Sequence, residues 1–166
     1  MMYGSADSQI EGATDRGPNV TEMAVFGLRT GLGERLFSAV LFGSRARGDS
    51  YPNSDWDLLV IAAGLPDAWL DRYQALKSML PPEIRGAVAM LGVTPEEFEA
   101  RVPALYLDIA LDGQILYDRS EYAMQRLAAL RHTMDKAGLY RERTEAGDRW
   151  TWVTPPGPSW SIEWES

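Results

Sequence analysis

Two carboxylates in one short stretch of the chain could do chemistry together. Residues 41–60 read LFGSRARGDSYPNSDWDLLV, with Asp55 and Asp57 separated by one residue at the start of an apolar run. Residues two apart on a β-strand project from the same face, so these two carboxylates would converge. Like charges side by side repel, and their burial is costly unless a cation lies between them. The spacing therefore predicts a binding site for a divalent metal ion.

A Gly-Ser pair precedes these acids by ten residues. Gly43 has no side chain and lets the backbone approach a ligand closely. Ser44 stands where a short helix would begin, and the free N–H groups at a helix start attract anions. Arg45 and Arg47 add positive charge, and a guanidinium fork fits a phosphate group, although both could also be solvated surface charges. We expect these four residues to bind the phosphates of a nucleotide.

A phosphate-binding turn beside a pair of acids suits phosphoryl or nucleotidyl transfer. In such reactions one metal ion lowers the pKa of the attacking hydroxyl and another neutralises the leaving pyrophosphate, while the protein supplies position. Ser44, Asp55 and Asp57 are the catalytic candidates, and Asp55 and Asp57 are the expected metal ligands. The chain has no Cys and one His, which excludes thiolate and multi-His metal sites. Carboxylate ligands favour Mg²⁺ or Mn²⁺.

The charge balance limits the partners of the chain. Its 166 residues carry 24 acidic and 16 basic side chains, a net charge of −8. Proteins that grip nucleic acid through its phosphates carry a basic face, so nonspecific binding of nucleic acid is not expected. The first twenty residues lack the features of a secretory signal, and no apolar run reaches about 18 residues. We therefore expect a cytoplasmic protein that does not enter membranes.

The patterning predicts an α+β domain in which a small mixed sheet is flanked by helices. A polar arm over 1–20, expected to be flexible, precedes a domain over 21–138, and a Trp/Pro-rich tail over 139–166 follows. Strands are expected over 37–42, 55–62, 87–93 and 114–117. Helices are expected over 21–37, 66–80 and 103–111, with another opening after Thr94 and a last one of about 18 residues ending at Gly138.

Two of these helices have predicted start signals. Thr94, Pro95 and Glu97 match an N-cap, a first helical position and the reciprocal partner of a capping box. Ser120 is expected to cap the last helix. His132 lies among charged residues of that helix, and we interpret it as an exposed structural residue.

The segment from Gly43 to Asp57 resembles the signature of the minimal nucleotidyltransferase group of the DNA polymerase beta superfamily. The motif is Gly43-Ser44, ten residues, then Asp55-Trp56-Asp57, and residues 113–118 (GQILYD) are similar to a stretch common in these proteins. The order of expected elements also matches, and the resemblance covers about residues 21–135. It implies that the Gly-Ser pair holds a nucleoside triphosphate and that the two acids bind magnesium.

One feature departs from the family pattern, which usually places a third acid on the next strand. Residues 86–93 read GAVAMLGV and contain no acid, with Ala87 or Ala89 at the expected place. Asp108 and Asp112 are the next candidates, but they lie on or just after a predicted helix. The family's third acid acts as a base toward the attacking hydroxyl or as a ligand of its metal ion. Activation of the nucleophile is therefore left open.

Three functions remain after these observations. The first is transfer of a nucleoside monophosphate from a nucleoside triphosphate to an acceptor such as a partner protein. The second is a catalytically weak binding module, and the resemblance implies an antitoxin that neutralises a helical HEPN-type partner. The third is a glycosyltransferase that uses Asp-x-Asp to hold a nucleotide sugar, a reading in which the Gly-Ser pair has no place.

The tail leaves two alternatives. It contains the tryptophans at positions 150, 152, 160 and 164 among several prolines. Their side chains either pack back on the domain or contact a partner, because Trp is enriched at interface hot spots. A second copy of the chain, giving a homodimer, is one such partner.

Overall fold

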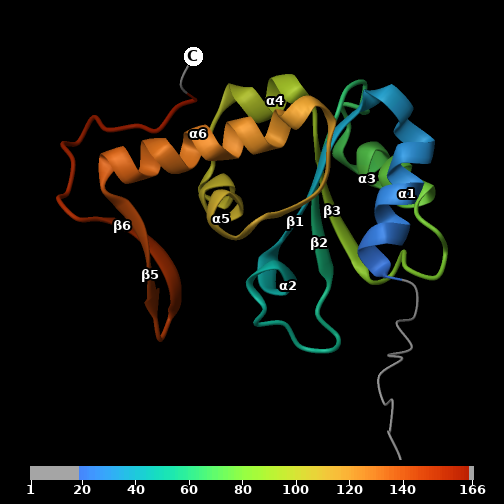
Figure 1. Cartoon of the computed structure of the whole chain (residues 1–166), viewed down its shortest axis with the longest axis horizontal. Helices are drawn as coiled ribbons and strands as arrows, with labels where there is room; N and C mark the ends of the chain where they lie inside the picture. The colour runs from blue at the N-terminus through green and yellow to red at the C-terminus, as the bar shows by residue number, and fades with distance from the viewer. Residues whose placement is uncertain (1–18, 165–166) are drawn as a thin grey trace, which may run out of the picture.

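A four-stranded mixed sheet forms the centre of residues 19–164, the part of the chain that the computed structural model describes (Figure 1). The strand order is β3-β2-β1-β4. Strand β1 (Leu36–Phe42) pairs antiparallel with both β2 (Trp56–Ala62) and β4 (Gln114–Asp118), whereas β2 runs parallel to β3 (Val88–Val93). The expected α+β class with a small mixed sheet is confirmed, and each strand lies within one residue of its predicted range.

Helices cover both faces of this sheet. Helices α1 (Val20–Leu32) and α3 (Trp69–Met79) pack on one face, and α4 (Pro95–Ala100), α5 (Ala104–Asp112) and α6 (Tyr122–Ala137) lie over the other (Figure 1). Alternate residues of β2 divide between the two cores. Burial of each Leu or Ile side chain there stabilises the fold by about 1.5 to 3 kcal/mol. The strand that carries the two acids is therefore fixed on both sides.

The first helix differs from its prediction at both ends. Its N-cap is Asn19, whose side chain accepts a hydrogen bond from the Thr21 N–H at 3.1 Å, so Val20 belongs to the helix and not to the arm. The rest of the expected arm, residues 1–18, lies outside the described residues. The helix ends at Leu32, because Gly33 leaves the helical conformation with a positive φ of 56°. The predicted extension to residue 37 is wrong, and a short 3-10 turn (Gly33–Arg35) leads directly into β1.

Helix α3 begins three residues later than predicted. Pro66 and the bend at Asp67 and Ala68 precede it, and the Pro66 carbonyl accepts a hydrogen bond from Arg72 Nε at 2.7 Å. By contrast, the predicted start of α4 is confirmed. Thr94 accepts from the Glu97 N–H at 3.2 Å, and the Glu97 side chain accepts from the Thr94 N–H at 2.9 Å, which completes the capping box.

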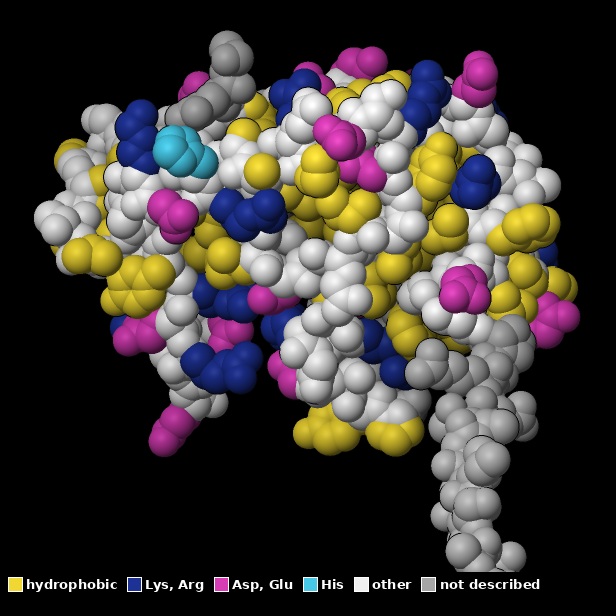
Figure 2. All heavy atoms as spheres, viewed as in Figure 1, with side chains coloured by type: hydrophobic (Ala, Val, Ile, Leu, Met, Phe, Trp, Pro, Cys, Tyr) yellow, Lys and Arg dark blue, Asp and Glu magenta, His cyan; other side chains and the backbone are white. Residues whose placement is uncertain are grey.

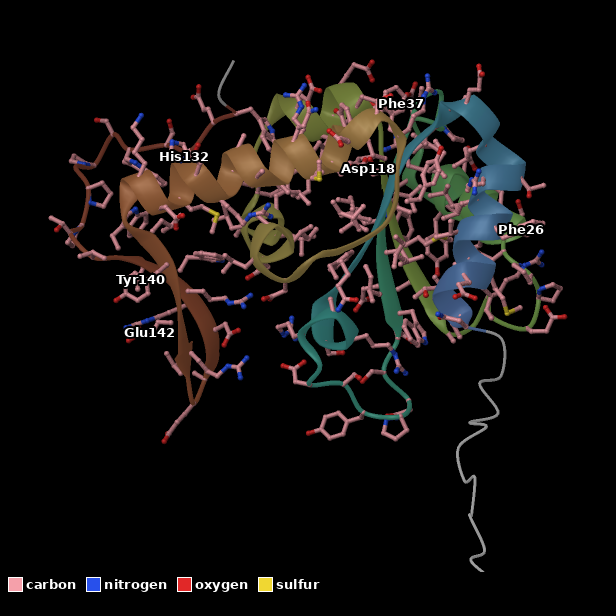
Figure 3. The ribbon with its side chains drawn as sticks, viewed as in Figure 1. Phe26, Phe37, Asp118, His132, Tyr140 and Glu142 are labelled. Carbon is pink, nitrogen blue, oxygen red and sulfur yellow. The ribbon has the colours of Figure 1, made fainter. Side chains whose placement is uncertain are left out.

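The predicted Ser120 cap of α6 is wrong. Ser120 and Glu121 have φ angles of 54° and 58°, and the helix begins after them. The cap is instead Asp118, at the end of β4, whose two carboxylate oxygens each accept an N–H at 2.9 Å, from Ala123 and Met124 (Figure 3). A carboxylate at a helix start also interacts favourably with the helix dipole. The predicted end of α6 at Gly138 is confirmed, with φ 65°.

The C-terminal part of the described chain forms a separate hairpin. Strands β5 (Leu139–Thr144) and β6 (Gly147–Trp152) pair only with each other. Beyond them, Trp164 Nε1 donates a hydrogen bond to the Phe98 carbonyl at 2.9 Å, and Trp152 packs against the same core. Of the two alternatives for the tail, packing on the domain is observed for these tryptophans. Within residues 19–164, no helix combines the length and apolarity needed to cross a bilayer.

Candidate functional site

The predicted phosphate turn and acid pair meet at one end of the sheet. Phe42, the last residue of β1, lies directly opposite Asp57 on β2. The chain then turns at Gly43, which has a φ of 73°. A Cβ atom on Gly43 would collide with the Asp57 carboxylate, whose Cγ would lie only 3.2 Å away. Only glycine combines this conformation with this approach, so the turn backbone lies against the acid.

The turn continues into the short helix α2 (Gly43–Arg47), with Ser44 in its first turn. Gly48 ends the helix in a left-handed conformation, and the Ser44 carbonyl accepts the N–H groups of Gly48 and Asp49 at 2.9 and 3.1 Å. Gln114 of β4 donates to the carbonyl of Ala46 at 3.0 Å, which ties α2 to the sheet edge. Ser44 is therefore held at the sheet end beside Gly43.

The charge of Asp55 acts on the carboxyl group of Asp57. Burial raises the pKa of the Asp57 carboxyl above its usual range, and the charge of Asp55 raises it further. The positive charge of Arg47 opposes both effects. Asp55 immediately precedes β2, so it stands at the strand entrance and Asp57 lies on the strand itself. The acids and Arg47 are therefore close enough for their charges to interact.

Asp57 faces the side of the sheet that α5 and α6 cover. Asp57 alternates with Leu59 and Ile61 along β2, and both apolar residues belong to the core beneath those helices. Trp56 projects to the opposite face and packs against the other core. The Asp57 carboxylate therefore lies on the side of the sheet where α5 and the β5–β6 hairpin are found.

The two arginines of α2 have different surroundings. Arg45 donates to the Ser54 carbonyl at 2.7 and 3.0 Å and to the Pro52 carbonyl at 3.1 Å. Its guanidinium carbon also lies 4.3 Å from the centre of the Trp56 ring. Arg45 therefore holds the loop that precedes the acids, on the face away from Asp57. Arg47 instead lies on the Asp57 side, and its Nε is 3.1 Å from Asp49 Oδ2.

A polar cleft opens beside Arg47. Its volume is about 440 Å³, and it lies between α2, α5 and the hairpin (Figure 2). Basic and acidic side chains line most of it, namely Arg47, Asp49, Asp108, Arg141, Arg143, Glu145 and Asp148. The volume falls within the range of about 300 to 1,000 Å³ that small-molecule sites usually have. The sequence predicted only the Arg47 side of this cleft.

The strand register shows which residue of β3 neighbours Asp57. Ala89 lies directly beside Asp57 on the parallel strand β3, and β3 carries no carboxylate. The two substitute candidates are occupied elsewhere. Arg141 donates to Asp112 at 2.6 and 2.9 Å and to Asp108 at 3.0 Å, and these bonds raise the pKa of Arg141. No local sequence pattern linked an arginine of the tail to these acids.

The donor set fits a hard divalent cation. Within residues 19–164, no cluster of three or more acidic or His side chains is positioned to hold a metal ion. Asp55 and Asp57 would supply two carboxylates, and phosphate oxygens and water commonly complete such a coordination shell. The like-charge interaction that raises the Asp57 pKa is the interaction that a cation would relieve.

A mixed sheet whose Gly-Ser turn packs against an acid strand is the arrangement that the motif resemblance led us to expect. Residues 34–122 match the family described as "Polymerase beta, Nucleotidyltransferase". The chain belongs to this family, as the motif resemblance predicted. The match includes β1, α2, β2 and β3 and ends at the start of α6, so the hairpin lies beyond it.

Individual relatives give a narrower comparison. The chain is 34% identical over 94 residues to "Putative protein adenylyltransferase MJ1305" of Methanocaldococcus jannaschii, which covers 54% of this chain and 64% of that protein, less than two thirds of its length.

Two crystal structures of toxin–antitoxin complexes are also similar. One contains AMP-PNP, with TM-score 0.47, 21% identity, and coverage of 70% of this chain and 90% of that one. The other is a tri-AMPylated Shewanella oneidensis HEPN toxin with its MNT antitoxin, with TM-score 0.46, 18% identity, and coverage of 70% and 88%.

Proposed function

We propose that this protein transfers a nucleoside monophosphate from a nucleoside triphosphate to a hydroxyl group of another protein. The observation that carries the proposal is the contact between the Gly43 turn and the Asp57 carboxylate, with Asp55 beside it. This contact would bring a bound phosphate chain next to a cation on the two acids. The choice of a protein acceptor is supported by the name of the M. jannaschii relative, of which this chain covers 64%.

The proposed step is a single displacement at phosphorus. The acceptor oxygen forms a bond to the α-phosphorus, the bond from that phosphorus to the bridging oxygen of the β-phosphate breaks, and pyrophosphate leaves. A Mg²⁺ or Mn²⁺ ion on Asp55 and Asp57 would supply neutralisation of the phosphate charge. Gly43 and Ser44 bind the phosphates, Arg47 adds positive charge on the same side, and Arg45 keeps the loop before the acids in place.

The hydroxyl proton has no carboxylate to receive it on β3. The residue of β3 beside Asp57 is Ala89, one of the two positions at which the motif resemblance expects the third acid, and its side chain is only a methyl group. The proton therefore passes to water or to a base that the acceptor brings. We expect slow transfer to water or small alcohols and faster transfer when a partner protein completes the site.

The same observation favours a second function. With Ala89 in place of an acid, the protein could bind a nucleotide and a partner with little turnover. The partner implied by the motif resemblance is a helical HEPN-type protein that the chain would neutralise as an antitoxin. The protein would then act by occupying its partner's surface and not by modifying it.

One experiment separates the two functions. The protein is incubated with Mg²⁺ and ATP labelled at the α-phosphate, with and without a helical protein encoded beside it, and label on protein and released pyrophosphate are measured. Transfer is expected with wild type and is expected to be lost in the double variant Asp55→Asn, Asp57→Asn. A double variant of the same charge change at two exposed helix positions, Asp71→Asn with Asp135→Asn, should transfer normally.

The outcomes are distinct. Nucleotide binding without label on any protein, and without pyrophosphate, would support the binding module. Undiminished transfer by the Asp55→Asn, Asp57→Asn variant would overturn the assignment of these acids.

A further inference from the structure

The β5–β6 hairpin faces the candidate site although it lies beyond the family match. Tyr140 and Glu142 project from the side of the hairpin that is turned away from α2 (Figure 3). Side chains alternate along a strand, so Arg141 and Arg143 project from the other side, and both line the cleft that Arg47 also lines. The hairpin therefore adds two guanidinium groups to the cleft.

These two arginines differ in how fully they are paired. Arg141 has a side chain only 15% exposed and forms ion pairs with Asp108, Asp112 and Asp148. Its charge is therefore balanced, and it connects the hairpin to α5. Arg143 is 72% exposed, and its ion pairs are long, 3.4 Å to Asp148 and 3.9 Å to Asp49. Exposed pairs at such distances contribute little stability, so the Arg143 guanidinium can be redirected to a ligand.

One carboxylate oxygen lies between the two sides of the cleft. Asp49 Oδ2 is 3.1 Å from Nε of Arg47 and 3.9 Å from Nη2 of Arg143. A single oxygen shared by two guanidiniums is the arrangement that a phosphate oxygen would adopt, because a guanidinium fork binds carboxylate and phosphate with similar geometry. Asp49 itself is 44% exposed at the end of α2, so it can turn to solvent when an anion replaces it.

We propose that Arg143 and Arg47 together bind the polyphosphate of the nucleoside triphosphate, and that Asp49 occupies the position between them until the nucleotide displaces it. The inference rests on the proposed function for the identity of the ligand. Of the other acids that line the cleft, Asp108 and Asp148 are paired with Arg141. Glu145 is exposed in the turn between β5 and β6, where solvent and salt screen its charge. A triphosphate carries about four negative charges at neutral pH, so a second arginine improves the local charge balance.

The test measures binding and needs no turnover. Mg²⁺-ATP and inorganic tripolyphosphate are titrated calorimetrically into wild type and into Arg143→Gln. Loss of one charge-assisted contact is expected to weaken both ligands about tenfold. Binding of adenosine, which has no phosphate, should not change.

The matched control is Arg149→Gln. Arg149 is 68% exposed, lies on the same hairpin and pairs with Glu142 on its outer side, so the variant has the same charge change without facing the cleft. It is expected to bind both ligands like wild type. Because both arginines are exposed, neither variant should shift the melting temperature appreciably.

A second variant tests the displacement of Asp49 in the opposite direction. Asp49→Asn keeps the shape of the side chain and removes the competing charge, so Mg²⁺-ATP is expected to bind about three- to fivefold more tightly. Equal affinities in wild type and Arg143→Gln, or equal losses in Arg143→Gln and Arg149→Gln, would overturn the role of Arg143. Weaker binding in Asp49→Asn would overturn the role of Asp49.

The inference and the proposed function fail in different ways. Arg143-dependent binding of Mg²⁺-ATP without any label transfer would leave the arginine pair in place and remove the enzymatic function. If Arg143→Gln transfers label at the wild-type rate and binds ATP with wild-type affinity, the role of Arg143 is overturned and the proposed enzymatic function stands. Wild-type protein that binds neither ATP nor tripolyphosphate would overturn the inference.

Discussion

The two walls of the cleft are held in place by different forces. The α2 wall continues directly from the sheet. There Phe42 of β1 pairs with Asp57 of β2, and the residues of β2 that follow Asp57 are buried. The hairpin wall is attached to α5 through Arg141 and its carboxylate partners, and Leu139, Trp150 and Trp152 pack on the core. Burial of apolar side chains is insensitive to salt and pH, whereas ion pairs weaken when salt screens them or acid protonates the carboxylates. We therefore expect the α2 wall to be the more rigid of the two, because the hairpin depends partly on its ion pairs.

A substitution in the α2 wall should reduce stability and transfer more than one in the hairpin wall. Gly43→Ala places a methyl group against the Asp57 carboxylate in a left-handed conformation, so we expect a loss of stability of about 2 kcal/mol and of nucleotidyl transfer of about a hundredfold. Chemical denaturation and the labelling assay measure the two effects.

The control for that change is Gly33→Ala. Gly33 has a similarly positive φ of 56°, but a Cβ there meets nothing within 4 Å. It should lose stability from backbone strain alone and keep its transfer rate. Equal losses of transfer in both variants would show that strain, and not the contact with Asp57, is responsible.

The carboxylate that β3 lacks beside Asp57 can be introduced by substitution. Ala89→Asp adds a carboxylate directly beside Asp57, and we expect transfer to accelerate about ten- to hundredfold, in proportion to what a positioned base contributes. The measurement is the initial rate at saturating Mg²⁺ and ATP. A variant that binds nucleotide but transfers no faster would show that the acceptor already supplies the base.

The hairpin wall should lose stability when Arg141, which connects it to α5, is replaced. Arg141→Gln leaves Asp108 and Asp112 without their partner, and a loss of stability of about 1 to 3 kcal/mol is expected. Hydrogen exchange should accelerate over residues 139–152 and remain slow in β1 and β2. Arg143→Gln, two residues away, should leave exchange unchanged. Uniform acceleration over the whole domain would contradict a separable hairpin.

The smallest effect is expected from an ion pair outside both walls. Arg72 lies 2.6 Å from Glu97 and holds the pKa of that carboxyl below its ordinary value, but Glu97 is 47% exposed. A lowered pKa in the folded state gives stability that is present above the ordinary glutamate pKa and is lost as pH falls through the lowered one.

Glu97→Gln should therefore cost less than about 1 kcal/mol at pH 7. The difference in melting temperature between Glu97→Gln and wild type should shrink on acidification. A difference that persists at a pH where Glu97 is protonated would show that the capping box, and not the charge, is what the substitution damages.

The spacing of residues along the sequence predicted the arrangement of the α2 wall well. The Gly43 turn and the acids lie on consecutive elements, so their contact follows from one antiparallel strand pair. The motif resemblance left Ala87 or Ala89 at the expected place of the third acid, and the register shows that Ala89 is the one that pairs with Asp57. The roles assigned to these residues in catalysis and nucleotide binding remain predictions.

The hairpin wall could not be predicted in the same way. The contact between Arg141 and Asp112 joins residues 29 positions apart, and β5 is too charged to show an apolar strand pattern. The start of α6 was mispredicted for a related reason. Ser120 has the residue type of a cap, but Asp118 at the end of β4 reaches the free N–H groups of α6 instead.

The cap of α6 has a consequence for the order in which the protein folds. Asp118 also accepts a hydrogen bond at 2.6 Å from the hydroxyl of Ser38, which lies fully buried in β1, 80 positions away. Contacts across such separations form late, because a long loop must close before they can stabilise anything. We therefore expect the final position of α6 to depend on prior pairing of β1 with β4. The hairpin that follows α6 would share that dependence, so we expect the cleft to be completed late in folding.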